Sequence, residues 1–157
     1  MGEGSGQRSR QIDIGGTALE RLILDTTVLI ASERGHWELD EVVQDDDDVA
    51  IAAVTAAELL VGVELADSRI RSHRSKFVDA VLESFHVEAY DLRVARMHAR
   101  LLGHVRRSGR TRGAHDLIIA ATAASMRRVV ITADSEGFDD LPVVDVRRLP
   151  PSSSKRD

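Results

Sequence analysis

Short apolar runs alternate with longer segments of helical periodicity along most of this chain. The apolar runs are rich in β-branched residues and are bounded by charged or turn-forming residues, which is typical of buried strands. We expect strands at 21–24, 49–54, 86–89, 128–132 and 143–146. The segments between them, roughly 27–44, 56–83, 92–107 and 115–127, are long enough for helices that cross from one strand to the next. This alternation predicts an α/β fold in which helices cover both faces of one parallel sheet.

The length and the two ends of the chain indicate a single domain. With 157 residues, 43% of them hydrophobic, the chain can bury one substantial core. Residues 1–20 and 150–157 are rich in small and charged residues, so we expect tails on either side of a domain over 21–149. No apolar run approaches the roughly 18 residues of a membrane span, and the first 20 residues lack the apolar centre of a secretory signal. We therefore expect a cytoplasmic protein that does not contact the membrane.

Two acidic residues follow strands that should be buried. Asp25 interrupts LILDTTVLI where the first strand ends, and Asp134 follows the fourth strand in VVITADSEGF. Asp25 has a structural alternative as the N-cap of a helix that begins near Thr27. Turn formation is the alternative for Asp134 and for Glu136, and for Glu136 it is the favoured one. Open α/β sheets nevertheless bind ligands at the carboxyl ends of their strands, where Asp25 and Asp134 lie.

Two further acids begin segments of helical periodicity. Glu58 follows Thr55 by three residues in VTAAELLVG, which is the spacing of a capping box, a purely structural device. Asp116 opens HDLIIAATAASM, whose apolar residues surround the predicted helix on every side and indicate that it is buried. An N-cap is the structural alternative for Asp116.

The four acids together favour a metal site. In a parallel sheet the strand ends and the helix beginnings meet at one edge, so these carboxylates are expected to share a cleft. Like charges in one cleft repel unless a cation compensates them. Because the chain has no cysteine, thiolate sites are excluded, and a hard divalent cation such as Mg²⁺ is the natural partner of carboxylate oxygens.

At these residues the chain resembles the PIN domain family, and within it the VapC-type toxins of bacterial toxin–antitoxin pairs. The resemblance covers about residues 21–149 and rests on four motifs in the family's order and spacing: LILDTTVLI, TAAELLVGVELA, GAHDLIIAATA and VVITADSEGF. It implies a five-stranded parallel sheet in the order 3-2-1-4-5 and an acidic pocket that binds Mg²⁺ or Mn²⁺. It further implies an endoribonuclease that hydrolyses RNA phosphodiester bonds and is held inactive by a cognate VapB-like antitoxin. We also expect a homodimer.

The resemblance assigns a role to each of the four acids. Asp25, Glu58 and Asp116 match the three core acids of the family's site, and Asp134 falls on the fourth. Asp25 and Asp116 would hold the principal ion, and Glu58 would orient or deprotonate the attacking water. Asp134 would help to hold a second ion that faces the leaving oxygen.

Further positions of the pocket follow from the same resemblance. Thr26 and Thr132 match small hydroxyl residues that line the pocket, and Glu136 sits where some relatives carry another acid. Gly137 occupies a position that is often polar, which leaves the ligands of the second ion open.

A basic stretch precedes Asp116, although the chain has 26 acidic and 21 basic residues. Residues 104–115 contain no acid and four arginines, which are Arg106, Arg107, Arg110 and Arg112. Arginine binds phosphate well because its planar fork donates two hydrogen bonds at once, so these residues are candidates for RNA binding. A solvated helix end followed by a loop is an equally weighted alternative. Only 3% of the residues are aromatic, which argues against a platform for base stacking.

Two other functions compete with the ribonuclease. One is a PIN module without catalysis that binds RNA or the antitoxin, but the presence of all four acids counts against it. The other is a receiver-type phosphoacceptor domain, which requires adjacent acids after the first strand and a lysine late in the sheet. This chain has a single Asp25 at the first place and no lysine between Lys76 and Lys155.

Overall fold

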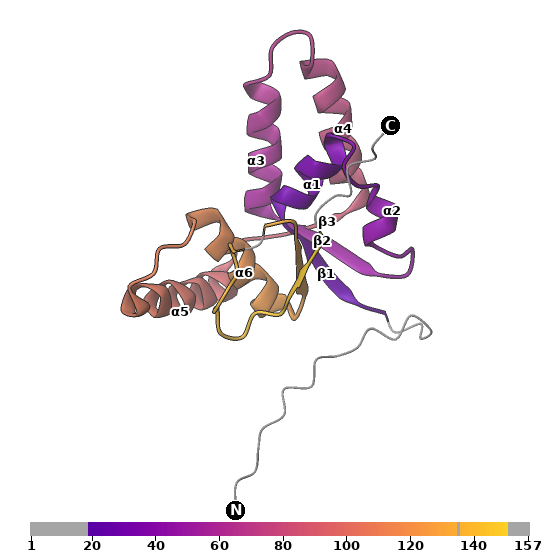
Figure 1. Ribbon diagram of the computed structural model, residues 1–157. Helices are drawn as coiled ribbons and strands as arrows, with labels where there is room; N and C mark the ends of the chain where they lie inside the picture. Colours follow the sequence, from indigo (N-terminus) through magenta and orange to yellow (C-terminus); the bar gives the residue numbers. More distant parts are fainter. Residues whose placement is uncertain (1–18, 135, 151–157) are drawn as a thin grey trace, which may run out of the picture.

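The computed structural model describes residues 19–134 and 136–150, which form one five-stranded sheet with helices on both faces (Figure 1). Residues 1–18 and 151–157, which make up most of the two predicted tails, lie outside the described residues. The strands are β1 (Arg21–Leu24), β2 (Asp48–Ala52), β3 (His86–Glu88), β4 (Val129–Thr132) and β5 (Val146–Arg148). All neighbouring strands are parallel and their order is β3-β2-β1-β4-β5, which confirms the predicted α/β fold and strand order.

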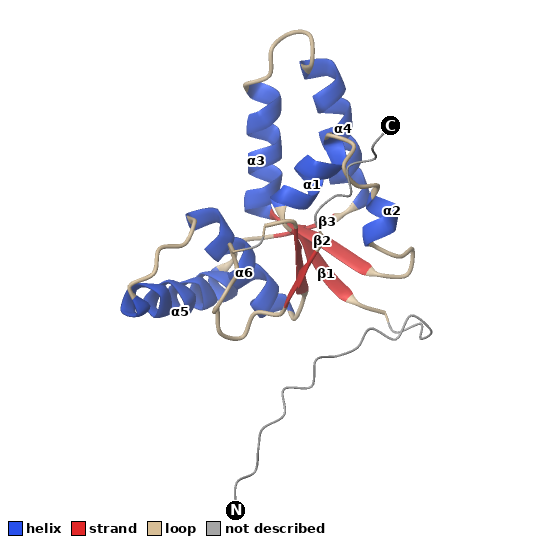
Figure 2. Cartoon of the chain, viewed as in Figure 1, coloured by secondary structure: helices blue, strands red, loops and turns tan. Residues whose placement is uncertain are grey.

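The helices form two groups on opposite faces of the sheet (Figure 2). They are α1 (Thr26–Glu33), α2 (Leu39–Val42), α3 (Ala53–Glu64), α4 (Arg71–Ser84), α5 (Leu92–Ser108) and α6 (Ala114–Met126). Each group has its own core, because successive residues of a strand point to opposite faces. In β1, Ile23 packs with α5 and α6, whereas Leu22 and Leu24 pack with α1 and α4. These three side chains are completely buried, as a central parallel strand requires.

Helix α6 lies between the sheet and α5, which explains why its sequence is apolar on every side. Ile119, Ala120 and Ala121 are fully buried, and α5 packs chiefly against α6. The prediction of a buried helix after Asp116 is confirmed. Within residues 19–134 and 136–150, no helix combines the length and the apolar character that crossing a membrane requires.

Two predicted helical segments are each divided in two. The segment 27–44 contains α1 and α2, and the chain turns between them at Gly35, whose φ of 75° is in the left-handed region that glycine adopts without strain. The segment 56–83 contains α3 and α4, which are joined by residues 65–70 and stand as a hairpin above the sheet (Figure 1).

The last predicted strand, at 143–146, is wrong by three residues. Val143 has a φ of 59° and is 72% exposed, so it cannot extend the sheet. The strand β5 begins only at Val146, which pairs with Val130 of β4.

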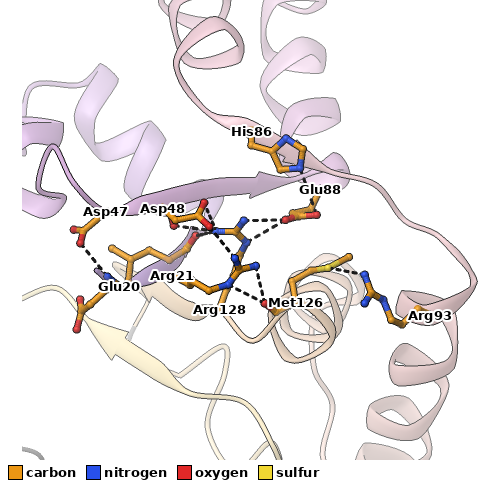
Figure 3. A network of polar contacts seen from close by, with 10 residues as sticks. Glu20, Arg21, Asp47, Asp48, His86, Glu88, Arg93, Met126 and Arg128 are labelled. Carbon is orange, nitrogen blue, oxygen red and sulfur yellow. Dashed lines mark hydrogen bonds and ion pairs between the residues drawn. The ribbon is translucent and has the colours of Figure 1, made fainter. Parts of the chain in front are cut away.

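A buried arginine ties the first three strands together on the α6 side of the sheet (Figure 3). The guanidinium of Arg128 donates to a side-chain oxygen of Glu88 at 3.0 and 3.1 Å and to the backbone carbonyls of Leu22 and Asp48. The side chain of Arg128 is 3% exposed and that of Glu88 is 10% exposed, so this ion pair is shielded from water. Arg128 also reaches the Asp48 carboxylate at 3.0 Å, and this hydrogen bond lowers the pKa of Asp48.

Candidate active site

Asp25 ends β1 and begins α1, and its carboxylate is held by three donors. It accepts hydrogen bonds from the backbone N–H of Thr26 at 2.8 Å, from the Thr27 hydroxyl at 2.7 Å and from the Thr132 hydroxyl at 2.8 Å. Asp25 is therefore the N-cap of α1, as the structural alternative proposed. The three hydrogen bonds fix the direction of a carboxylate that is only 2% exposed.

Glu58 lies beside α1, and the predicted capping box is wrong. Helix α3 begins at Ala53 with Ala52 as its N-cap, so Thr55 is already inside the helix. The Glu58 carboxylate instead accepts from the Thr26 hydroxyl at 3.3 Å and pairs with the His115 ring at 3.1 Å. The side chain of Glu58, at 29% exposed, thus bridges the beginnings of α1 and α6.

Asp116 lies in the first turn of α6 and does not cap it. The N-cap of α6 is Gly113, so the N-cap interpretation of Asp116 is wrong. Burial, and after it the negative charges of Asp25, Asp134 and Glu58, together raise the pKa of Asp116 to about 6. The other three acids therefore lie close enough to Asp116 for their charges to act on it.

Asp134 approaches Asp116 across a glycine. A Cβ atom on Gly137 would stand 2.7 Å from Oδ2 of Asp134 and 3.0 Å from Oδ2 of Asp116. A side chain here would force the carboxylates to shift, so glycine is what allows both of them to lie this close to the backbone at residue 137. The backbone N–H of Asp134 donates to the Thr132 hydroxyl at 3.0 Å, and that hydroxyl in turn donates to Asp25.

Glu136 is exposed, and its backbone N–H takes part in a turn. Its backbone N–H donates to Oδ1 of Asp134 at 3.0 Å, which is the turn geometry that the alternative interpretation expected. The structure thus brings together Asp25, Glu58, Asp116 and Asp134, with Thr26 and Thr132 between them, and it leaves the Glu136 side chain at the rim.

The donors of this cluster fit a hard divalent cation. They are carboxylate and hydroxyl oxygens, which Mg²⁺ and Mn²⁺ prefer, and a cation would neutralise the negative charges that, after burial, raise the pKa of Asp116. Among residues 19–134 and 136–150, no three His, Asp or Glu side chains converge at distances that would hold an ion as they stand. Binding therefore requires rotation of the carboxylates.

The four predicted RNA-binding arginines occupy two different environments. Arg106 and Arg107 are exposed in the last turn of α5. Arg110 forms an ion pair with Asp140, and the two residues line a cavity of about 330 Å³ beside the end of α5. Arg112 donates from its two terminal nitrogens to the carbonyl oxygens of Glu136 at 2.7 Å and Asp139 at 2.6 Å.

Arg112 is thus a structural link between two loops, and this contact was not predicted. It joins the segment before α6 to the segment after β4. Asp116 lies in the first turn of α6, and Asp134 lies in the segment after β4. Sequence reasoning also missed Thr27 and His115, which bond to Asp25 and Glu58. Their positions next to Thr26 and Asp116 are the only signal that would have pointed to them.

Comparison with known proteins agrees with this geometry. The chain is 43% identical over 130 residues to Ribonuclease VapC5 of Mycobacterium tuberculosis, covering 81% of this chain and 94% of that protein. It is 28% identical over 130 residues to Ribonuclease VapC of Rickettsia bellii, covering 82% of this chain and 96% of that protein.

Solved structures give the same result for the fold. The crystal structure of VapBC-5 from M. tuberculosis, a member of the VapBC family of toxin–antitoxin systems, matches with a TM-score of 0.68 and 38% identity over 82% of this chain and 98% of that chain. VapBC2 from Rickettsia felis, solved with a DNA fragment from its promoter, matches with a TM-score of 0.75 and 18% identity over 82% of this chain and 98% of that chain. Residues 22–144 match the PIN domain, and since this match takes in the whole sheet up to β4 and all four acids, the chain belongs to the PIN domain family.

Proposed function

We propose that this chain is a VapC-type ribonuclease, a toxin that hydrolyses RNA phosphodiester bonds and is inhibited by a VapB-like antitoxin. The observation that carries the proposal is the meeting of Asp25, Glu58, Asp116 and Asp134 at one edge of the sheet. These residues come from four separate segments of the chain, so packing of the core alone does not account for their meeting. The ribonuclease names of the relatives support the same reaction.

Each acid has a contact that suits a particular task in phosphodiester hydrolysis. Asp25 is oriented by three hydrogen bonds and is suited to hold a ligand in one fixed direction. Asp116 and Asp134 both lie close to Gly137 and would supply further oxygen ligands to the same ion. Glu58 is held by Thr26 and His115 at the edge of the cluster, where it would orient the attacking water and accept its proton.

The proposed cofactor is Mg²⁺, with Mn²⁺ as a substitute, held by Asp25, Asp116 and Asp134. When bound, the ion supplies positive charge at the scissile phosphate and activates water. Thr132 orients two of these acids, because its hydroxyl donates to the Asp25 carboxylate and accepts from the backbone N–H of Asp134. The Thr26 hydroxyl donates to the Glu58 carboxylate and orients it.

RNA would approach past the end of α5. Arg106 and Arg107 are exposed there and Arg110 stands at the rim of the neighbouring cavity, so these three are proposed to contact phosphate. Arg112, with both terminal nitrogens bonded to its own chain, is proposed to hold the site together rather than to bind RNA.

The proposed partners follow from the relatives. Structures similar to this chain are VapBC complexes, which supports a VapB-like antitoxin as the inhibitor, and a homodimer is part of the same proposal. A toxin that cuts cellular RNA acts where that RNA is, so the proposed location is the cytoplasm.

The test is cleavage of RNA by the purified protein freed of its antitoxin. Cleavage is expected with Mg²⁺ or Mn²⁺ and is expected to stop with EDTA. Asp25→Asn and Asp116→Asn keep the shape of the side chain but remove its charge, so each should lose roughly 10²-fold or more of the activity. Asp79→Asn, on the exposed side of α4, is the matched control and should behave as wild type.

Three outcomes would contradict the proposal. Cleavage that continues in excess chelator would remove the metal from the mechanism. Growth arrest by the Asp116→Asn form would reduce that residue to a structural role. RNA or antitoxin binding without any cleavage would assign the chain to the non-catalytic class.

A further inference from the structure

Helix α5 carries only positive formal charges, although the chain as a whole has a net charge of −5. Its 17 residues include five arginines and no acid. The arginines are all exposed, and they are Arg93, Arg96, Arg100, Arg106 and Arg107. The helix is thus an exception to the composition of the molecule and needs an explanation of its own.

Four of these arginines lie on one line along the helix. At about 100° per residue, Arg93, Arg96, Arg100 and Arg107 fall within a sector of roughly 60°, and no other residue of α5 falls within it. With a rise of about 1.5 Å per residue, this arginine stripe is roughly 21 Å long. The buried residues of α5, such as Leu101 and Val105, lie well outside that sector. Of these four arginines, the sequence predicted an RNA contact only for Arg107.

The stripe faces solvent. Helix α5 packs chiefly against α6 and lies at the periphery of the molecule (Figure 1). The guanidinium of Arg107 folds back over Gly103, where its nearest nitrogen is 3.2 Å from the place that a Cβ would take. Gly103 therefore leaves room for Arg107 to lie flat on the helix, in line with the other three arginines.

The charge of the stripe is not neutralised by its own chain. In the part of the chain that the structure describes, none of its four arginines forms an ion pair. Among the described residues, the one side-chain hydrogen bond from these four arginines runs from Arg93 to the sulfur of Met126, at 3.0 Å. Some other surface arginines do pair with acids, among them Arg21, Arg147 and Arg148.

The stripe leads toward the acidic site. Helix α5 ends at Ser108 with Gly109 as its left-handed C-cap, and residues 109–113 connect it directly to α6, whose first turn carries Asp116. An acidic site repels a polyanion, so an RNA strand must be held by positive charge outside the site.

We propose that the arginine stripe binds the phosphate backbone of the RNA strand beyond the bond that is cleaved. This inference rests on the proposed ribonuclease function and adds an extended binding track to it. The stripe contains no apolar residue, whereas protein interfaces are centred on apolar or aromatic anchors. The guanidinium groups match phosphate, and their row provides several contacts of one kind, as a sequence-independent backbone track does.

The first test is the salt dependence of RNA binding, measured with the Asp116→Asn form so that the RNA is not cut. For single strands, each phosphate contact contributes about −0.7 to the slope of log affinity against log salt. The variant Arg93→Gln/Arg96→Gln/Arg100→Gln should therefore flatten the slope by about 2. Between 50 and 200 mM salt, wild-type stripe binding should then weaken about 20-fold more than binding by the variant.

The matched control removes three positive charges from other parts of the surface. Arg34→Gln/Arg69→Gln/Lys76→Gln changes exposed residues of the α1 end, the α3–α4 connection and α4. This control should keep the wild-type slope. A stripe variant whose slope equals that of the control would overturn the inference.

A second measurement separates the stripe from the active site. With Mg²⁺, the stripe variant and the wild type should cut a trinucleotide equally, while kcat/KM for a long RNA should fall about 10-fold in the variant. A wild type that cuts neither RNA would refute the proposed function, yet the binding slope would still report on the stripe. Loss of antitoxin binding with an unchanged RNA slope would overturn the inference and assign the stripe to a protein partner.

Discussion

One hydroxyl group connects two of the proposed catalytic acids. The Thr132 side chain donates to Asp25 and accepts from the backbone N–H of Asp134, so this one oxygen links the two acids at the ends of β1 and β4. Burial and then the neighbouring carboxylates raise the pKa of Asp116 to about 6, so its negative charge is unfavourable in this site. The site therefore holds negative charge in place against repulsion, and this has measurable effects on stability.

The first prediction concerns the stability of Asp116→Asn. Since the folded-state pKa of Asp116 is about 6 and its ordinary value is 3.8, ionisation destabilises the fold as the pH rises from about 4 to above 6. The variant removes this cost, on the order of 1 kcal/mol after allowing for solvent at a half-buried group. Melting in EDTA at pH 7.5 should give a Tm about 2–4 °C above wild type. At pH 4 the two proteins should melt together, and an equal difference at both pH values would contradict the explanation.

The second prediction concerns the space at Gly137. In Gly137→Ala the new methyl group would collide with the carboxylates of Asp134 and Asp116, which must then move apart. We expect cleavage activity to fall about 10-fold or more and the Mg²⁺ concentration for half-maximal activity to rise. Gly62→Ala is the control, because its methyl group would meet only Arg74 at an ordinary 3.7 Å within α3. Equal activity of the two variants would show that the two carboxylates do not need this proximity.

At the scale of elements, the loops on either side of α6 and β4 determine the shape of the site. Arg112 joins the loop before α6 to the loop after β4 through two carbonyl oxygens. Asp116 follows the first of these loops, in the first turn of α6, and Asp134 lies in the second, so the bridge helps to keep the two acids close. It does so without touching either carboxylate, which makes Arg112 a positioning residue.

The third prediction is that Arg112→Lys lowers the apparent affinity for Mg²⁺ and has little effect on the stability of the fold. A lysine has one nitrogen and cannot reproduce the two bonds of the planar fork. We expect the Mg²⁺ concentration for half-maximal cleavage to rise several-fold with a Tm within about 2 °C of wild type. Arg110→Lys, which keeps an exposed ion pair with Asp140, should leave both values unchanged. If RNA affinity falls and the metal dependence does not, Arg112 belongs to the RNA surface instead.

How much of this could be read from the sequence differs between elements. The strand at 21–24 was predicted to the residue, because a central parallel strand is apolar on both faces and ends at a charged residue. The strand at 143–146 was wrong because the left-handed backbone of Val143 is set by the turn around it, which an apolar pattern does not show. The capping box at Thr55 failed for a related reason, since α3 begins two residues earlier at Ala53.

The site was predictable in its acids and not in their supports. Acids after buried strands stand out in a sequence, and all four of the proposed ligands and bases lie together. Arg112 and Arg128 read as ordinary surface charges, since the carbonyl and carboxylate oxygens that they bind lie 24 to 106 residues away in the chain. Only the folded structure brings these partners together.

At the scale of the whole molecule, the proposed catalytic acids and the buried Arg128 ion pair lie at opposite ends of the strands. The acids lie beyond the carboxyl ends of β1 and β4, whereas Arg128 precedes β4 and bonds to the carbonyls of Leu22 and Asp48 near the starts of β1 and β2 (Figure 3). Changes at one end should therefore leave the other largely intact.

The fourth prediction uses this separation. Arg128→Met leaves the buried Glu88 with only the exposed His86 beside it, which should cost about 3–5 kcal/mol of unfolding free energy, measured by urea denaturation. Arg21→Met removes an ion pair whose side chains are 49% and 45% exposed, and it should cost less than about 1 kcal/mol. Replacing both Arg128 and Glu88 with Met should restore most of the lost stability, and a double variant as unstable as Arg128→Met would contradict the account.

The order of the strands also has a consequence for the gene. The proposed site takes its acids from residue 25 to residue 134, and β1 gains its second neighbour only when β4 inserts beside it. A polypeptide that stops before β4 lacks Asp134 and leaves Asp25 without the Thr132 hydroxyl. Nonsense and frameshift mutations anywhere upstream of β4 should therefore abolish the proposed ribonuclease activity of the product. Selection for escape from such a toxin has a target that spans most of its reading frame.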